Sequence, residues 1–70
     1  MSAKGPQELL REAAEAALTA ARKLAWAREA LSRGYLKEAV RSMGEARGEL
    51  RRSLNLVKRA SAALKQRAPA

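Results

Sequence analysis

The stretch Leu31-Ser32-Arg33-Gly34-Tyr35-Leu36 decides the fold, because it interrupts an otherwise continuous rhythm of mostly apolar residues. On either side of it these residues recur at alternating steps of four and three, which places each set on one stripe of an α-helix. The two stripes comprise Leu10, Ala14, Ala17, Ala21, Leu24, Arg28 and Leu31 before the break, and Leu36, Val40, Met43, Arg47, Leu50, Leu54, Val57, Ser61 and Leu64 after it. A turn this short leaves neighbouring helices antiparallel. We therefore predict an all-α fold, a two-helix antiparallel hairpin.

The residues that flank the stripes fit the ends of these helices. Pro6 suits the first helical position after a Gly5 cap, and Gly34 suits the left-handed position just past a helix end. Pro69 stands beyond the second helix as a stop. We expect a single domain with a flexible arm before it and a short tail after it: arm 1–5, domain 6–67 with helices over about 6–32 and 35–66, and tail 68–70.

Antiparallel pairing about the turn predicts which residues face each other. If Leu31 faces Leu36, the remaining pairs are Leu24 with Met43, Ala17 with Leu50, Ala14 with Leu54 and Leu10 with Val57. Alanines of the first helix thus face larger residues of the second, and such matching fills layers without voids. We expect this stripe to form the contact between the two helices.

The apolar surface of the first helix is too broad for one partner helix to cover. It is widened by further residues beside the stripe: Ala13, Ala16, Ala20 and Ala27 on one side, and Leu18 and Ala25 on the other. With 70 residues and neither cysteine nor histidine, the chain also has no disulfide and no conventional zinc or haem site to support a small core. We therefore expect a homodimeric four-helix bundle with an interface that includes Leu10, Ala14, Ala17, Ala21, Leu24, Leu50, Leu54 and Val57.

Three residues outside the stripe complete the expected interface. Gly44 and Gly48 each cost about 1 kcal/mol relative to alanine inside a helix. We interpret them as a place where a helix of another chain approaches closely, with tolerated surface glycine as the alternative. Trp26 points away from the stripe, either as an edge anchor packed on aliphatic stems or as a contact for a partner.

Two arginines interrupt the stripe itself. Arg28 and Arg47 occupy positions at which an apolar residue is expected. In the simpler interpretation their stems pack while their charged heads reach the edge. In the sharper one they set the register by pairing with Glu45 or Glu49.

Charge gives the strongest indication of function. The formal net charge is +8 and the isoelectric point is about 11.2, yet no acidic residue follows Glu49. The outer side of the second helix carries a basic stripe of Lys37, Arg41, Arg51, Arg52, Lys58, Arg59 and Lys65. A one-sided basic stripe suits phosphates, since neutralising them releases condensed counterions. We expect a ligand such as structured RNA or duplex DNA, bound without base reading.

A second interpretation stays open beside nucleic acid. In the hairpin the basic end of the second helix lies beside Glu8, Glu12 and Glu15, which can pair with Arg52 or Arg59. The hairpin is then a protein-interaction or assembly module. Its partners are a second copy of the chain in either case, and RNA, DNA or another protein in addition.

Enzyme chemistry is not expected. General acid and base catalysis usually needs histidine or a desolvated carboxylate, and the chain has no histidine, no aspartate, no cysteine and no glycine-rich phosphate loop. The Glu8, Glu12 and Glu15 cluster fits a solvated first turn better than a metal site. We expect no cofactor and no metal. No signal-like or spanning apolar run is present, so we expect a cytoplasmic protein that does not bind membranes.

Local patterns resemble known helical hairpins. Gly34-Tyr35-Leu36-Lys37-Glu38-Ala39-Val40, with Met43 and Ala46, resembles the turn and second helix of a tetratricopeptide repeat over about a third of the chain. Leu36, Ala27 and Arg51 depart from that pattern. Similar turns occur in HEPN-type domains, whose arginine-to-histidine ribonuclease motif is absent here. In size and inferred architecture only, the chain is similar to Rop-type hairpins, which dimerise into a four-helix bundle and bind paired RNA loops.

Overall fold

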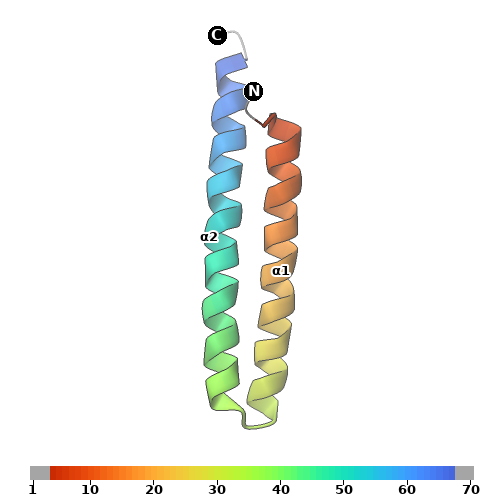
Figure 1. Ribbon diagram of the computed structural model, residues 1–70, viewed down its shortest axis with the longest axis vertical. Helices are drawn as coiled ribbons and strands as arrows, with labels where there is room; N and C mark the ends of the chain where they lie inside the picture. Colours follow the sequence, from red (N-terminus) through yellow and green to blue (C-terminus); the bar gives the residue numbers. More distant parts are fainter. Residues whose placement is uncertain (1–3, 68–70) are drawn as a thin grey trace.

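The computed structural model describes residues 4–67 and places them in two long α-helices joined by a tight turn (Figure 1). α1 spans Pro6–Ser32 and α2 spans Leu36–Arg67. The helices lie side by side and antiparallel, with principal extents of 54 × 25 × 12 Å. The predicted all-α hairpin is confirmed. Most of the expected arm and the whole expected tail, 1–3 and 68–70, lie outside the described residues.

The turn is closed by two backbone hydrogen bonds around a left-handed glycine. Gly34 has a φ of +81°, and its N–H donates to the carbonyl of Leu31 at 3.0 Å. The N–H of Tyr35 donates to the carbonyl of Ala30 at 2.8 Å. This pair of bonds is the Schellman motif, which satisfies carbonyls that the helix end leaves free. The carbonyl of Tyr35 then accepts the N–H of Ala39 at 3.0 Å and so starts α2.

The start of α1 follows from local chemistry in the same way. Gly5 is the N-terminal cap, and its carbonyl accepts the N–H of Leu9 at 3.0 Å. Pro6 occupies the start of the helix, where its missing N–H has no intrahelical partner to lose. Glu8 lies in the first turn, where the helix dipole favours an anion.

The two helices meet along a seam of mostly small side chains, which we call the alanine seam. It comprises the buried residues Leu9, Ala13, Ala16, Ala20, Ala27 and Ala30 of α1 and Ala39, Ser42, Ala46, Leu56 and Ala60 of α2. Two serine hydroxyls cross it. The Oγ of Ser42 donates to the carbonyl of Lys23 at 2.7 Å, and the Oγ of Ser53 donates to the carbonyl of Ala13 at 2.8 Å. Short side chains allow close approach, but each buries little apolar area.

The predicted contact stripe lies one residue away from the alanine seam on both helices. Leu24 and Met43, which were expected to face each other inside the hairpin, are 45% and 43% exposed. The residues just before them, Lys23 and Ser42, are the ones that the hydrogen bond joins. The same offset holds further along, where the bonded pair is Ala13 and Ser53 rather than the expected Ala14 and Leu54. At these two places the helices pair near the predicted levels, but the predicted rotation of each helix is wrong by one residue, about 100°.

This rotation leaves the larger apolar residues on one open side of the hairpin. In an antiparallel pair, a one-residue step turns the side chains of both helices toward the same side. Accordingly, Leu10 of α1 and Leu64 of α2 line one shallow groove. We call this side the apolar face: Leu10, Ala14, Ala17, Ala21, Leu24, Arg28 and Leu31 of α1, and Leu36, Val40, Met43, Arg47, Leu50, Leu54, Val57, Ser61 and Leu64 of α2. Its leucines, valines and methionine are 42% to 64% exposed.

Replacement by alanine should change the stability of the fold in opposite directions at Gly34 and at Gly48. Gly34→Ala forces a side chain into the left-handed region and should lower the free energy of unfolding by about 1 kcal/mol. At Gly48 an added Cβ meets no other side chain of residues 4–67 within 4 Å, so Gly48→Ala should raise the free energy of unfolding by up to about 1 kcal/mol. Urea unfolding followed by circular dichroism measures both. A destabilising Gly48→Ala would contradict the open surroundings of this residue.

Candidate interaction surfaces

The side opposite the apolar face carries six of the seven glutamates and four arginines and is called the charged face. Each of its residues directly precedes either a residue of the alanine seam or one of Lys23, Glu49 and Ser53, which continue the spacing of the seam. The charged face comprises Glu8, Glu12, Glu15, Thr19, Arg22, Trp26 and Glu29 of α1, and Glu38, Arg41, Glu45, Gly48, Arg52, Asn55 and Arg59 of α2. The ion pair between Lys23 Nζ and Glu45 Oε1, at 2.8 Å, joins the helices on this side. The hairpin is therefore a slab with one apolar and one charged surface.

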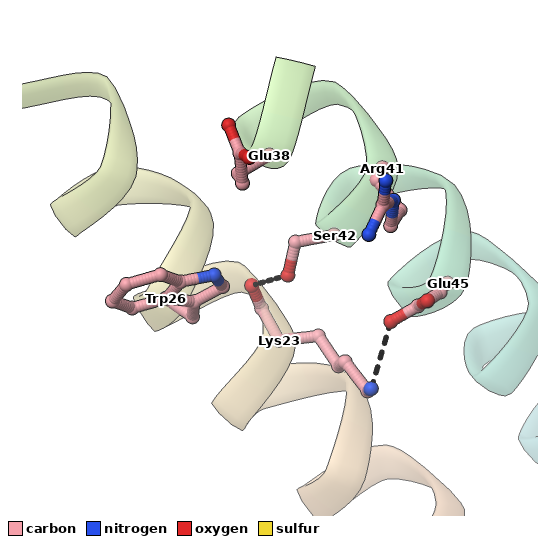
Figure 2. Close-up of a pocket in the computed structure, with 6 residues that line it drawn as sticks. All are labelled: Lys23, Trp26, Glu38, Arg41, Ser42 and Glu45. Atoms are coloured by element: carbon pink, nitrogen blue, oxygen red, sulfur yellow. Dashed lines mark hydrogen bonds and ion pairs between the residues drawn. The ribbon is translucent and has the colours of Figure 1, made fainter. Parts of the chain in front are cut away.

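One groove on the charged face has Trp26 on one side, and we call it the tryptophan groove (Figure 2). It is lined by Lys23, Trp26, Glu38, Arg41, Ser42 and Glu45. Figure 2 shows Ser42 pointing from α2 to the Lys23 carbonyl, and Lys23 reaching back to Glu45. The hydrogen bond from Lys23, together with its positive charge, lowers the pKa of Glu45. With two cations and two carboxylates, this groove has no net preference for an anion.

A second groove lies nearer the C-terminal end of α2 and is strongly basic. It is lined by Glu12, Gly48, Arg51, Arg52, Asn55, Leu56 and Arg59, and we call it the arginine groove. Arg52 lies 3.9 Å from a carboxylate oxygen of Glu12 and 3.9 Å from one of Glu49. Of the expected pairings between this end of α2 and the α1 carboxylates, the one between Arg52 and Glu12 is therefore present.

Several cations surround the Glu12 carboxylate and stabilise its charged form. A hydrogen bond from Lys4 is the main cause that lowers the pKa of Glu12, and the charges of Lys4, Arg52 and Arg11 act in the same direction. Partial desolvation opposes them. Arg11 also pairs with Glu8 at 3.0 Å. The carboxylates of Glu8 and Glu12 are thus already engaged by Arg11 of α1 and by Lys4, which lies two residues before the helix.

The structure divides the predicted basic stripe into two rows. Arg41, Arg52 and Arg59 lie on the charged face. Lys37, Arg51, Lys58 and Lys65 recur at multiples of seven residues on the outer flank of α2, away from α1. Within residues 4–67, Arg52 is the only one of these seven that forms an ion pair.

The arginine groove brings together three members of the stripe and one residue that the prediction omitted. Arg51, Arg52 and Arg59 line it, whereas Arg41 lies in the tryptophan groove instead. The added residue is Asn55, an uncharged side chain that no charge pattern selects. Asn55 lies one helical turn from each of these arginines, and this spacing is the feature of the sequence that could have placed it in the groove.

The residues predicted for the interface with a second copy fall on different sides. Leu10, Ala14, Ala17, Ala21, Leu24, Leu50, Leu54 and Val57 belong to the apolar face. Trp26, 45% exposed, and Gly48 lie on the charged side, and Gly44 lies on the outer flank of α2. Within residues 4–67, apart from the surrounding backbone of α2 itself, no atom lies within 4 Å of a Cβ built at Gly44 or Gly48, so the predicted close approach there does not come from this part of the chain.

Metal-binding clusters and membrane-spanning helices are both absent from the part of the chain that the structure describes. Residues 4–67 contain no group of three or more aspartate, glutamate, cysteine or histidine side chains placed to hold a metal ion. Neither helix has an apolar stretch of the length needed to cross a bilayer. The candidate binding surfaces of the hairpin are the two grooves on the charged face and the exposed apolar face.

Acid should weaken the hairpin partly through Glu45. Because its pKa is lowered in the folded chain, its ion pair stabilises the fold above about pH 4.5 and is lost as pH falls through the lowered pKa. Glu45→Gln should therefore lose less stability than the parent between about pH 5 and pH 3, measured by thermal unfolding. Glu38→Gln makes the same change of charge without an ion pair in residues 4–67 and serves as control. Equal acid sensitivity of the parent and Glu45→Gln would refute the role of this pair.

Comparison with known proteins adds no identity to this description. Among the hairpins to which the sequence shows a resemblance, the feature supported by the structure is the two-helix antiparallel hairpin itself. Comparisons with protein-family models, curated proteins and solved structures found no match.

Proposed function

We propose that the protein is a small non-enzymatic binding protein that contacts the phosphates of structured RNA or duplex DNA through the basic end of α2. The observation that carries this proposal is the arginine groove, where Arg51, Arg52 and Arg59 surround Asn55 on an exposed surface. Lys58 and Lys65 continue the positive surface, and no acidic residue follows Glu49 in the sequence.

The chemistry of these side chains suits a phosphate backbone. Guanidinium groups donate paired hydrogen bonds to phosphate oxygens, and an asparagine amide adds a neutral donor. Residues seven apart on a helix are separated by about 10 Å along its axis. Arg51, Lys58 and Lys65 therefore form a row of evenly spaced cations along α2 that can follow one phosphate backbone. Contacts of this kind fix position without reading base sequence.

The acidic residues at this end of α1 weaken but do not cancel the attraction. Both contacts of Arg52 to Glu12 and Glu49 are 3.9 Å long, beyond hydrogen-bonding distance. An exposed ion pair contributes about 0–1 kcal/mol, so a phosphate can compete for this guanidinium. Arg59 forms no such pair within residues 4–67.

Base stacking plays no part in the proposed binding. Trp26 lies in the other groove, beside Glu38 and Glu45, rather than among the arginines. A single-strand binder needs aromatic platforms along its positive groove. A duplex or a folded RNA, which presents phosphates at fixed spacing, is the better match.

We also propose that the apolar face is covered by a second copy, giving a homodimeric four-helix bundle. The alanine seam buries mainly alanine, and exposed leucine, valine and methionine side chains run along the whole open side. A contiguous apolar surface of this kind marks an interaction site. The alternative function, an assembly module for a different protein, is favoured by the same exposed side chains.

Charge reversal tests the nucleic-acid proposal. The double variant Arg52→Glu/Arg59→Glu should bind duplex DNA and structured RNA at least tenfold more weakly at low salt, because two phosphate contacts become repulsive. Fluorescence anisotropy against salt concentration should also show a shallower salt dependence than the parent. The matched control is Arg22→Glu/Arg33→Glu, which changes the net charge equally but lies on α1 and at the turn.

Two results would refute this assignment. One is an absence of binding by the parent chain at low salt. The other is an equal loss of affinity in the control variant, since the effect would then follow net charge rather than the arginine groove.

A charge on the apolar face tests self-association. Leu50→Lys should shift the chain from dimer to monomer in sedimentation velocity at micromolar concentration, because a buried ammonium group would lose its hydration. Trp26→Lys replaces an equally exposed side chain on the charged face and should leave the dimer intact. A parent chain that sediments as a monomer would refute the bundle while leaving the nucleic-acid test unaffected.

A further inference from the structure

We infer that the two copies associate with their turns at the same end, so that α1 of each copy packs on α2 of the other. This inference rests on the proposed self-association through the apolar face. Twofold symmetry allows two ways to bring these faces together. With the turns at the same end, α1 lies on the partner's α2; with the turns at opposite ends, α1 lies on α1 and α2 lies on α2.

The edges of the apolar face differ strongly in charge between the helices. Every seventh residue of α2 borders this face directly after one of its large apolar residues: Lys37, Gly44, Arg51, Lys58 and Lys65. The matching row on α1 is Arg11, Leu18, Ala25 and Ser32. The edge of α2 thus bears four positive charges and no negative one, whereas the edge of α1 bears a single positive charge.

This asymmetry disfavours the opposite-end arrangement. Packing α2 on the partner's α2 would place two all-basic edges side by side, and like charges held close together oppose association. Packing α2 on the partner's α1 places each basic edge beside the nearly neutral one. There, Leu18, 52% exposed, and Ala25 offer apolar surface to the aliphatic stems of arginine and lysine.

The sizes of the side chains on the apolar face favour the same arrangement. Hydrogen bonds across the seam join Ser53 to Ala13 and Ser42 to Lys23, so Ala14 and Ala17 of α1 lie within a helical turn of the levels of Leu54 and Leu50 of α2. With the turns together, each of these alanines meets the larger side chain of the partner's α2. With the turns apart and the copies fully overlapped, Ala14 and Ala17 meet alanines of the partner's α1, while Leu50 meets its own copy and Leu54 lies opposite an arginine. Small-against-large matching fills layers evenly.

The interrupting arginine of α2 fits this arrangement as well. Arg47 lies level with Ala21, so in the same-end dimer its stem crosses a short side chain of the partner. Arg47 lies one helical turn from Gly44 and Arg51 of the outer flank, so its guanidinium can reach the solvent at the edge.

A distance between spin labels distinguishes the two arrangements. The chain has no cysteine, so Arg33→Cys gives one label per copy, at the turn. With the turns together, pulsed electron paramagnetic resonance should report about 15–25 Å between the labels, the width of a bundle. With the turns apart, the separation should be about 40 Å, since α1 rises about 1.5 Å per residue.

A second label makes the result interpretable. Arg22→Cys, near the middle of α1, should give a distance below about 30 Å in either arrangement, which shows that labelled chains still associate. A short distance at position 22 with about 40 Å at position 33 would overturn the inference. If neither label gives an inter-label distance because the chain is a monomer, both the inferred arrangement and the proposed dimer are overturned. The same holds if the chain is a monomer that binds phosphatidylserine vesicles through its apolar face. Nucleic-acid binding by such a monomer would still stand.

Discussion

The close approach of two helices through alanine and serine is the constraint on which the rest of the structure depends. Ala20 and Ala30 are completely buried, and the hydroxyls of Ser42 and Ser53 reach carbonyls of α1. Hydroxyls that short can reach the opposite backbone only if the axes lie near each other. The same closeness leaves little room for large side chains in the seam, which buries only two leucines, Leu9 and Leu56, far from the turn. Most of the larger apolar side chains therefore remain on one open surface. Small residues inside the hairpin therefore produce the apolar face outside it.

The rotation that the seam imposes also separates the charges. Because most of the larger apolar residues take one side, six of the seven glutamates lie on the other, together with Arg22, Arg41, Arg52 and Arg59. A row of cations, Lys37, Arg51, Lys58 and Lys65, follows the outer flank of α2. The carboxylates of α1 lie level with the acid-free end of α2, where Lys4 and Arg11 partly neutralise them. The arginine groove remains positive for this reason. A chain with the same composition but a different rotation would mix these surfaces, and the proposed division between self-association and phosphate binding would not arise.

Local chemistry was enough to predict the helix ends, whereas the rotation of the helices was not predictable from spacing. Gly34 and Pro6 act through their own backbone conformations, so their roles are visible in the sequence. By contrast, the stripe through Leu24 and the stripe through Lys23 obey the same alternation of four and three. The stripe through Leu24 is the more hydrophobic and was therefore predicted as the core. The stripe through Lys23 forms the contact instead, because its small side chains let the two helices pack closely. The contents of the two grooves depend on that rotation, which is why Asn55 was missed and Arg41 separated from the other arginines.

The position of the turn has a consequence for how the hairpin opens. Ala30 and Ala39 are close in sequence, so their contact closes a short loop, while Leu9 and Leu56 enclose most of the chain. The entropy cost of closing a loop grows with its length, so the seam assembles from the turn outward and frays from the far end inward. The arginine groove lies toward that fraying end. A polyanion bound in the arginine groove would therefore stabilise the end of the hairpin that closes last.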